Sequence, residues 1–198
     1  MEREFQPLVV RELGLGAGFC RPVQLRPAHV TPDSPAREVM TDLSRVSPAT
    51  IRPQAPVSGA HHYMISRGVR LLLVVDDHES ILGVVTATDI LGERPMLVAR
   101  ERGLRVDEQT VADVMTPAER VQVMSIEDVE AARVGHIVAT LRHQGRQHAL
   151  VMQADGDRRR ALVRGIFSLT QIARQLGVTM QPTVVAGTFA EIEAVLSK

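Results

Sequence analysis

Two stretches of the chain place apolar residues at the three- and four-residue spacing of an amphipathic helix. Each stretch is followed by a glycine, Gly68 or Gly145, and glycine is the residue expected just after a helix ends. The pattern therefore predicts two equivalent helices, one in each half of the chain. The first apolar face consists of Val57, Ala60, Met64 and Ile65, and the second consists of Val134, Ile137, Val138 and Leu141.

Two short apolar runs follow each predicted helix, with an acidic turn between them. Runs of this length bounded by turn residues are typical of buried strands. In both copies the second run contains a glycine, and a hydroxyl residue follows three positions later, Thr86 or Ser168, before a further helical segment. The predicted strands are 71–75 and 81–85 in the first copy, and 149–152 and 161–166 in the second.

A short motif near the start of each copy completes an internal repeat. Glu38-Val39-Met40-Thr41 returns 75 residues later as Asp113-Val114-Met115-Thr116. One matched tetrapeptide is weak, but the same order of motif, helix, glycine, strand, turn, strand and hydroxyl occurs twice. Such self-similarity is the sequence signature of a repeat architecture.

The remaining segments connect or flank these repeats. Residues 1–35 contain five prolines and no clear period, which predicts an extended arm. Residues 92–110 are an insertion, in which Pro95 fits a first helical turn and Gly103 fits a helix end. We expect repeat 1 at 36–103, repeat 2 at 104–178, and a tail with a short helix at 179–198.

The end of the second strand in repeat 1 carries a hydroxyl and a carboxylate, Thr86 and Asp89, at the start of a predicted helix. Backbone N–H groups at a helix start attract phosphate, a hydroxyl can donate to a phosphate oxygen, and a carboxylate can accept from two ribose hydroxyls. The pattern suits a nucleotide. It is equally typical of a helix cap, in which Thr86 or Thr88 accepts a backbone hydrogen bond and Asp89 favours the helix dipole.

Taken together, these motifs resemble a pair of CBS (cystathionine β-synthase) repeats over residues 38–177. The resemblance implies an α/β (α+β) fold, in which two βαββα-type units pack as a pseudo-two-fold pair, the Bateman module, with two related clefts. In repeat 1 it rests on Val39-Met40-Thr41, Gly68-Val69-Arg70, Leu73-Val74-Val75-Asp76 and Gly83-Val84-Val85-Thr86 with Asp89-Ile90. In repeat 2 it rests on Val114-Met115-Thr116-Pro117, Leu150-Val151, Gly165-Ile166-Phe167-Ser168 and Gln171-Ile172.

The resemblance also implies which residues line the clefts. In the first cleft Thr86 and Asp89 would contact phosphate and ribose, while the base pocket and its border would come from Thr50, Ile51, Arg70 and Leu71. The second cleft would use Gln122, Val123, His148, Ser168 and Gln171.

Two departures from the family pattern limit this expectation. Gln171 stands where the family has Asp, and an amide is not a charged double acceptor. The proline often found in the strand after the first helix of each repeat is replaced by Leu73 and Leu150. We therefore expect one competent cleft, built on Thr86 and Asp89, and a weaker second cleft.

Composition and charge exclude several other classes. The 23 basic and 23 acidic residues give a net charge of zero, so no global field indicates nucleic acid or an anionic membrane. The single cysteine, Cys20, cannot form an intrachain disulfide, and the longest aliphatic run is too short for a membrane helix. We expect a cytoplasmic protein. The histidines lack metal-ligand spacing, and no nucleophile and base occur together, so we expect neither a metal site nor an enzyme.

The sequence thus favours a regulatory module without a required cofactor. By resemblance it would bind AMP, ADP, ATP or S-adenosylmethionine as a regulatory ligand and would signal to an unidentified protein partner. A scaffold that kept the fold without binding nucleotide is the alternative. CBS pairs usually associate as dimers through helices, so we expect a homodimer formed by the two apolar helix faces.

Overall fold

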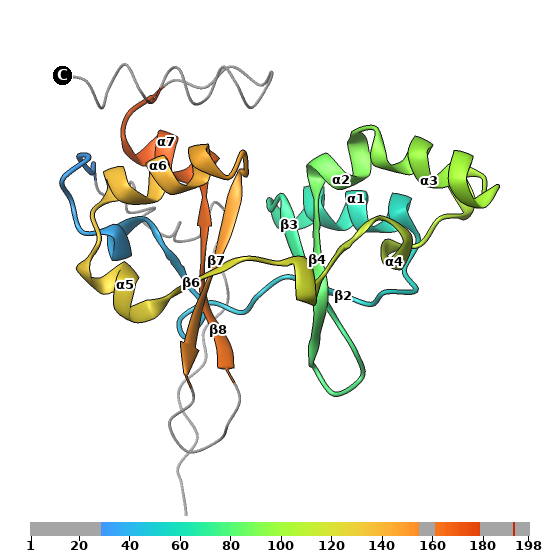
Figure 1. The fold of residues 1–198 in the computed structure, drawn as a ribbon, viewed down its shortest axis with the longest axis horizontal. Coiled ribbons are helices and arrows are strands. Elements are labelled where there is room, and N and C mark those ends of the chain that lie inside the picture. The colour runs from blue at the N-terminus through green and yellow to red at the C-terminus, as the bar shows by residue number, and fades with distance from the viewer. Residues whose placement is uncertain (1–28, 155–160, 179–191, 193–198) are drawn as a thin grey trace, which may run out of the picture.

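The computed structural model describes residues 29–154, residues 161–178 and Ile192. These residues form two lobes, each a four-stranded sheet with helices on its outer face, and the two sheets face each other across the middle of the molecule (Figure 1). The mixed α/β fold with two repeated units is confirmed.

Lobe 1 is built on the sheet with strand order β2-β3-β4-β5. The short strand β2 runs parallel to β3, whereas β3 and β4 form an antiparallel hairpin. Its elements from repeat 1 are β2 (Thr50–Ile51), α1 (Val57–Arg67), β3 (Leu71–Val75), β4 (Ile81–Thr86) and α2 (Ala87–Leu91).

Lobe 2 has the equivalent sheet, with strand order β1-β8-β7-β6. Again the first short strand, β6, is parallel to its neighbour, and β7 and β8 are antiparallel. Its elements from repeat 2 are β6 (Val123–Ser125), α5 (Ile126–Ala131), α6 (Val134–His143), β7 (His148–Ala154), β8 (Ala161–Ser168) and α7 (Leu169–Gln175).

The two repeats exchange their leading segments. The 3-10 helix η1 (Ala36–Val39) and strand β1 (Thr41–Asp42) lie at the start of repeat 1, but β1 pairs with β8 of lobe 2. Conversely, α4 (Val111–Val114) and β5 (Thr116–Pro117) lie near the start of repeat 2, but β5 pairs with β4 of lobe 1. The matched tetrapeptides therefore occupy equivalent places in opposite lobes, and each lobe contains chain from both sides of the repeat boundary.

The strand glycines allow these exchanged segments to approach closely. A Cβ atom on Gly83 would lie 2.3 Å from the carbonyl oxygen of Thr116 in β5. A Cβ atom on Gly165 would lie 2.3 Å from Sδ of Met40, the residue before β1. The repeated glycine thus leaves room for the incoming segment, whose backbone an added Cβ would meet at Gly83 and whose Met40 side chain it would meet at Gly165.

The insertion between the repeats adds a helix to the end of lobe 1. Helix α3 (Arg94–Arg102) contains Pro95 in its first turn and ends at Gly103, which has a positive φ of 67°. This confirms the predicted helix in the insertion. The 3-10 helices η2 (Val106–Glu108) and η3 (Ala118–Arg120) lie before α4 and after β5.

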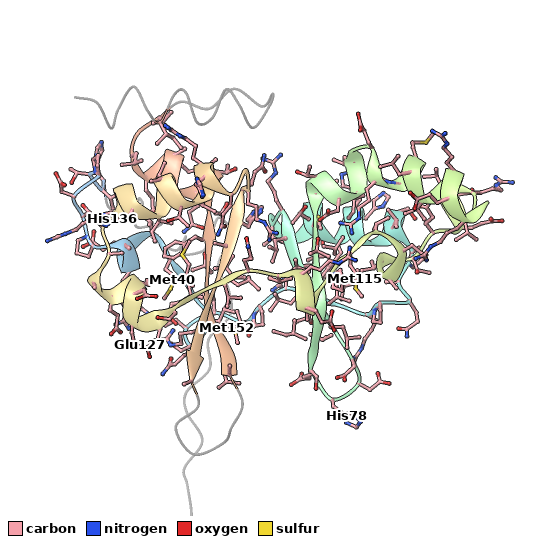
Figure 2. All side chains as sticks on the ribbon, in the orientation of Figure 1. Met40, His78, Met115, Glu127, His136 and Met152 are labelled. Atoms are coloured by element: carbon pink, nitrogen blue, oxygen red, sulfur yellow. The ribbon has the colours of Figure 1, made fainter. Side chains whose placement is uncertain are left out.

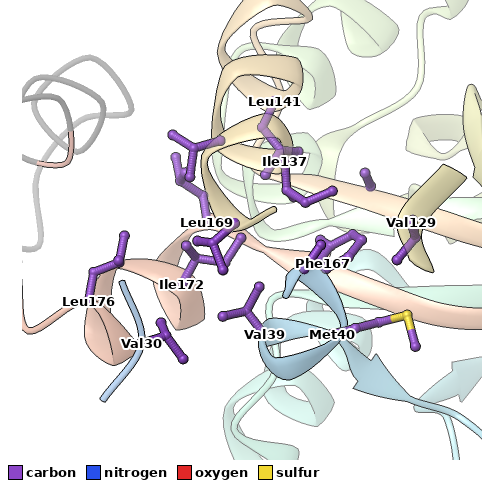
Figure 3. Packing of buried hydrophobic residues seen from close by; sticks show 14 of the residues in the cluster. Val30, Val39, Met40, Val129, Ile137, Leu141, Phe167, Leu169, Ile172 and Leu176 are labelled. Carbon is purple, nitrogen blue, oxygen red and sulfur yellow. The ribbon is translucent and has the colours of Figure 1, made fainter. Parts of the chain in front are cut away.

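Three apolar clusters account for the core. One lies inside lobe 1, one inside lobe 2, and a third joins the two sheets through residues such as Leu73 and Leu150. In lobe 2, Val30 and Val39 from the start of the described chain pack with Ile172 of α7 and with Leu176, which directly follows that helix (Figure 3). The exchanged segment and the residues just before it are therefore part of the lobe 2 core.

The helix faces predicted from periodicity are mostly correct, with one exception. All four residues of the second face and three of the first are buried, but Ile65 is 65% exposed. Because these faces are already used by the cores of their own lobes, they are not available for a homodimer as the sequence suggested. The exposed apolar side chains on the lobe 1 helices are instead Tyr63, Ile65, Leu91, Met96 and Leu97.

The predictions for the N-terminal arm and for the C-terminal tail have different outcomes. Within the predicted arm, residues 1–28 lie outside the described residues, whereas Val30 donates its N–H to the carbonyl of Gln175 at 3.1 Å. Of the predicted tail helix, Ile192 is described, and it is helical and fully buried in the lobe 2 cluster. Among the described residues, no helix is long and apolar enough to cross a membrane.

Candidate functional site

A cavity of about 280 Å³ lies between the two lobes, at the end of β4, which leads into α2, and at the start of β7. Lobe 1 contributes Thr86, Thr88 and Asp89 to its wall, and Thr116 comes from the exchanged strand β5. The opposite wall is formed by residues 145–150, which comprise the end of the α6–β7 connection and the first three residues of β7. The cavity is therefore assembled from both repeats and from the segment that links them.

Thr86 and Asp89 are held by a reciprocal helix cap at the start of α2. The N–H of Asp89 donates to Oγ1 of Thr86 at 3.2 Å, while the N–H and hydroxyl of Thr86 donate to Oδ2 of Asp89 at 2.9 and 2.7 Å. This capping box satisfies backbone donors that would otherwise lack partners. The capping interpretation of the motif is confirmed, and the Thr86 hydroxyl already both donates and accepts.

Arg94 binds the other oxygen of Asp89. Its Nη1 lies 2.9 Å from Oδ1 of Asp89 and 3.2 Å from Oγ1 of Thr116, and its Nη2 donates to the carbonyl of Met115 at 2.8 Å. Met115 lies between α4 and β5, where Figure 2 labels it. The guanidinium group thus joins the first residue of α3 to the cap of α2 and to the exchanged segment. No sequence pattern indicated this role of Arg94, because its partners lie 5 to 22 positions away without a repeated spacing.

The floor of the cavity is apolar. It consists of Leu71, Val84 and Leu150, which are 8%, 6% and 4% exposed and belong to the cluster that joins the two sheets. An aliphatic floor beside polar walls is the common design of a small-molecule site. Such a surface can accommodate a flat, weakly polar group such as a nucleobase.

Several polar side chains on the cavity wall have no protein partner. Within the described residues, the side chains of Thr88, Gln122, Arg146 and Gln147 make no hydrogen bond or ion pair, although all four border the cavity. They come from three separate parts of the chain. Donors and acceptors that converge without partners on one space can serve a polar ligand.

His148 is held neutral in the cavity wall. Burial, and to a lesser extent the nearby Arg70 cation, lower the pKa of its imidazole to about 4, and the Asp89 carboxylate acts in the opposite direction. At neutral pH the side chain therefore carries no charge and has one donor and one acceptor nitrogen.

Residues that were expected in two separate clefts, one for each repeat, border a single cavity in the structure. Gln122 and His148, assigned to the second cleft, border the same cavity as Thr86, Asp89 and Leu71. The reason is that the two sheets face each other, so a cleft at the end of one repeat is closed by the other. Arg70 does not line the cavity and acts on it through His148.

Thr50 and Ile51 lie elsewhere. They border a separate cavity of about 390 Å³, together with Arg52 and Tyr63, on the outer part of lobe 1. Val123 borders a third, largely aliphatic cavity of about 440 Å³, between the β3–β4 turn and the β7–β8 hairpin. Figure 2 shows His78 at the tip of that β3–β4 turn. Neither cavity includes the capping box.

The equivalent place in lobe 2 is closed by a direct side-chain contact. The hydroxyl of Thr41 in β1 donates to Oε1 of Gln171 in α7 at 3.2 Å, and Ser168 makes no side-chain cap for α7. Neither Ser168 nor Gln171 lines any of the three cavities described above. In addition, Arg164 forms an ion pair with Asp42 beside this contact.

No group of three or more metal-ligating side chains occurs within the described residues.

Comparison with known proteins agrees with this architecture. Residues 36–95 match the family model of the CBS domain. This match covers most of the first repeat, and the chain has the fold of a tandem CBS-domain pair. It is also 33% identical over 66 residues to the uncharacterized protein MK0525 of Methanopyrus kandleri, a match that covers 33% of this chain and 34% of that protein. The matched part is about a third of the length of that relative.

Solved structures of low sequence identity share the fold. An uncharacterized conserved protein from Pyrococcus horikoshii matches with a TM-score of 0.55 and 21% identity, over 78% of this chain and 100% of that one. CBSX2 in complex with AMP matches with a TM-score of 0.51 and 20% identity, over 71% and 94%. The CBS domain pair of protein MJ0100, in complex with 5′-methylthioadenosine and S-adenosyl-L-methionine, matches with a TM-score of 0.50 and 21% identity, over 74% and 98%.

Proposed function

We propose that this chain is a regulatory module that binds an adenosyl ligand in the cavity between its lobes and passes the ligand state to a protein partner. The observation that carries this proposal is the convergence of partnerless polar side chains, the Asp89 carboxylate and an aliphatic floor on one cavity. Support also comes from two proteins of the same fold, whose structures contain AMP in one case and methylthioadenosine and S-adenosylmethionine in the other.

The chemistry of the wall suggests how such a ligand would lie. The base would rest on Leu71, Val84 and Leu150, and the ribose hydroxyls would face Asp89. Arg146, which has no acidic partner in the described residues, is the available cation for a phosphate or carboxylate group. Neutral His148 can donate to or accept from the same group without adding charge.

The size of the cavity narrows the ligand class. Its volume of about 280 Å³ is at the low end of ligand sites, which typically measure about 300–1,000 Å³. A nucleoside or nucleoside monophosphate matches this space, whereas the outer phosphates of ATP would extend into solvent. We therefore expect AMP or a thioether adenosyl ligand to bind more tightly than ATP.

The decisive experiment is calorimetric titration of the wild type and two aspartate variants with AMP, ADP, ATP and S-adenosylmethionine. Asp113 provides a matched control for Asp89, because it forms the same capping box with Thr110 and the same kind of ion pair, with Arg102, away from the cavity. Asp89→Asn and Asp113→Asn thus remove the same structural interactions, but only the first removes the proposed ribose acceptor.

We expect Asp89→Asn to weaken binding by about 1.5–3 kcal/mol, the usual contribution of a hydrogen bond to a charged group, which is roughly a 10- to 100-fold loss of affinity. Asp113→Asn should bind as the wild type does. Equal losses in both variants would mean that Asp89 acts only through the fold.

The alternative function is a scaffold that binds no nucleotide. The observation that favours it is the capping box itself, since the bonds between Thr86 and Asp89 account for both residues without a ligand. If none of the four ligands produces heat with the wild type or raises its melting temperature, the scaffold becomes the better explanation. In neither case do we propose catalysis.

A homodimer belongs to the same proposal. Ile65, Leu91 and Met96 on the lobe 1 helices are each at least 64% exposed, and apolar side chains exposed in this number can mark an interaction surface. Light scattering coupled to gel filtration should give twice the monomer mass of 21.7 kDa for the wild type. Ile65→Arg with Met96→Arg should return it to the monomer, whereas a monomeric wild type would remove this part of the proposal.

A further inference from the structure

Helix α3 is fastened at each end by an arginine that binds the aspartate of a capping box. At the first residue of α3, Arg94 binds Asp89 of the α2 cap, on the cavity wall. At the last residue, Arg102 binds Oδ1 of Asp113 in the α4 cap at 2.6 Å. The two attachments are chemically alike, but only the one at Asp89 lies in the candidate ligand site.

The hydrogen bonds of Asp89 leave too little room for a ribose diol. A carboxylate offers about four lone-pair positions. Oδ2 accepts two bonds from Thr86, and Oδ1 accepts one from Arg94. A diol that donates two hydrogen bonds would therefore compete with an existing donor. The hydrogen bonds from Thr86 are local and form the cap of α2. Arg94 is the donor that a diol would displace, because Arg94 keeps other acceptors.

We propose that Arg94 is a latch that a bound diol displaces, so that it sets the affinity of the cavity and couples ligand binding to the attachment of α3. This inference rests on the proposed binding of an adenosyl ligand. When Arg94 leaves Oδ1 of Asp89, its Nη2 can keep the carbonyl of Met115, so the guanidinium group is not left without a partner. The contact that is lost, between Arg94 and Asp89, is the one that joins the cavity wall to the first residue of α3.

Helix α3 can report this change because the Arg94 latch is at its first residue, beside the buried Pro95 and Val98 that pack the helix on lobe 1. Val98 is 8% exposed and packs in the lobe 1 core, and Gln109 donates to the carbonyl of Pro95 at 2.8 Å. On the solvent side, Met96 and Leu97 are 66% and 50% exposed. If the N-terminal end of α3 is loosened, the positions of Met96 and Leu97 on the surface change. Ligand binding in the cavity would then alter the surface of the insertion.

The expected size of the effect follows from the exposure of the ion pair. The side chains of Arg94 and Asp89 are 36% and 18% exposed, so the pair is closer to a surface ion pair than to a buried one. Pairs of this kind change an equilibrium by a factor of about two to five. Removing Arg94 should therefore tighten diol binding by about two- to fivefold.

The test uses Arg94→Met, with Arg102→Met as the matched control at the other end of α3. Adenosine is the probe, because it carries the diol without a phosphate that the arginine could attract, and 2′-deoxyadenosine lacks one of the two donors. Calorimetry of the full chain should show adenosine binding two to five times more tightly to Arg94→Met than to the wild type. The gain should shrink with 2′-deoxyadenosine, and Arg102→Met should match the wild type.

Hydrogen exchange gives a second readout. Saturating adenosine should speed amide exchange in residues 94–102 of the wild type, and Arg94→Met should show that faster exchange without ligand. Unchanged or weaker binding by Arg94→Met, with the wild type binding normally, would overturn the latch and leave the proposed function intact. If neither protein binds adenosine or AMP, both the proposed function and the latch fail.

Discussion

The equivalent glycines of the two repeats should differ in their tolerance of a side chain. At Gly83 an added Cβ would meet the backbone of β5, 2.3 Å from the carbonyl oxygen and 3.1 Å from the carbonyl carbon of Thr116. At Gly165 it would meet the side chain of Met40, 2.3 Å from Sδ and 2.6 Å from Cγ. Backbone cannot move without breaking the β4–β5 pairing, whereas a methionine side chain has three rotatable bonds with which to adapt.

The magnitudes follow from this difference. Overpacking in a core costs about 1–3 kcal/mol. We place Gly83→Ala near the upper end, about 3 kcal/mol, because β5 must shift by roughly 1 Å and Val114, which packs in the lobe 1 core, shifts with it. Gly165→Ala should cost about 1 kcal/mol. Each alanine also lowers the conformational entropy of the unfolded chain. This offsets about 0.4–1 kcal/mol of the destabilisation in both variants.

The assay is urea unfolding followed by far-UV circular dichroism, since the chain has no Trp and one Tyr and is poorly suited to fluorescence. For a protein of this size, 1 kcal/mol corresponds to about 2–4 °C in melting temperature, so after the offset Gly83→Ala should melt about 4–10 °C below the wild type. Gly59→Ala is the control, because its Cβ would meet Pro56 at an ordinary 3.8 Å on a helix. An equal or larger loss for Gly165→Ala would refute the argument from backbone contact.

Three further predictions follow from single residues. His148 has a folded pKa of about 4, below the ~6.5 of an unfolded histidine, so only the unfolded chain binds this proton between those values. Stability should therefore fall as the pH drops from about 6.5 to 4, and His148→Gln should flatten this part of a stability–pH curve measured by urea unfolding. Ile192→Ala should lower the unfolding free energy by about 2–4 kcal/mol, because Ile192 is fully buried in lobe 2; no change would mean that its burial there adds nothing. Phe167→Ala, at the centre of the same cluster, should cost about 3–5 kcal/mol and serves as the upper reference for that lobe.

The elements that sequence predicted well are those whose signal is local. The run Leu71–Val75 is a continuous apolar stretch, and β3 has those limits in the structure. Gly68 and Gly145 both have positive φ values, 63° and 62°, just after their helices. In each case the pattern is set by neighbours in the chain, because helix ends and buried strands constrain residue type over a few positions.

The exchange of leading segments had no such local signal. Strands β1 and β5 each contain two residues, which is too short for any periodicity to show. The repeated tetrapeptide revealed that 38–41 and 113–116 are equivalent, but equivalence does not say which sheet each segment joins. That choice depends on tertiary contacts, chiefly on the open space above Gly83 and Gly165.

The same reasoning explains the regrouping of the candidate site. Assignment by repeat keeps Thr86 with Thr50 and His148 with Ser168, because a repeat is a unit of sequence. The cavity instead depends on how the two sheets pack. Because the sheets are joined through Leu71, Val84 and Leu150, each sheet closes the cleft at the end of the other. A site between paired repeats is therefore built from opposite halves of the chain. Its key ion pair can then involve an insertion residue such as Arg94, which no repeat pattern contains.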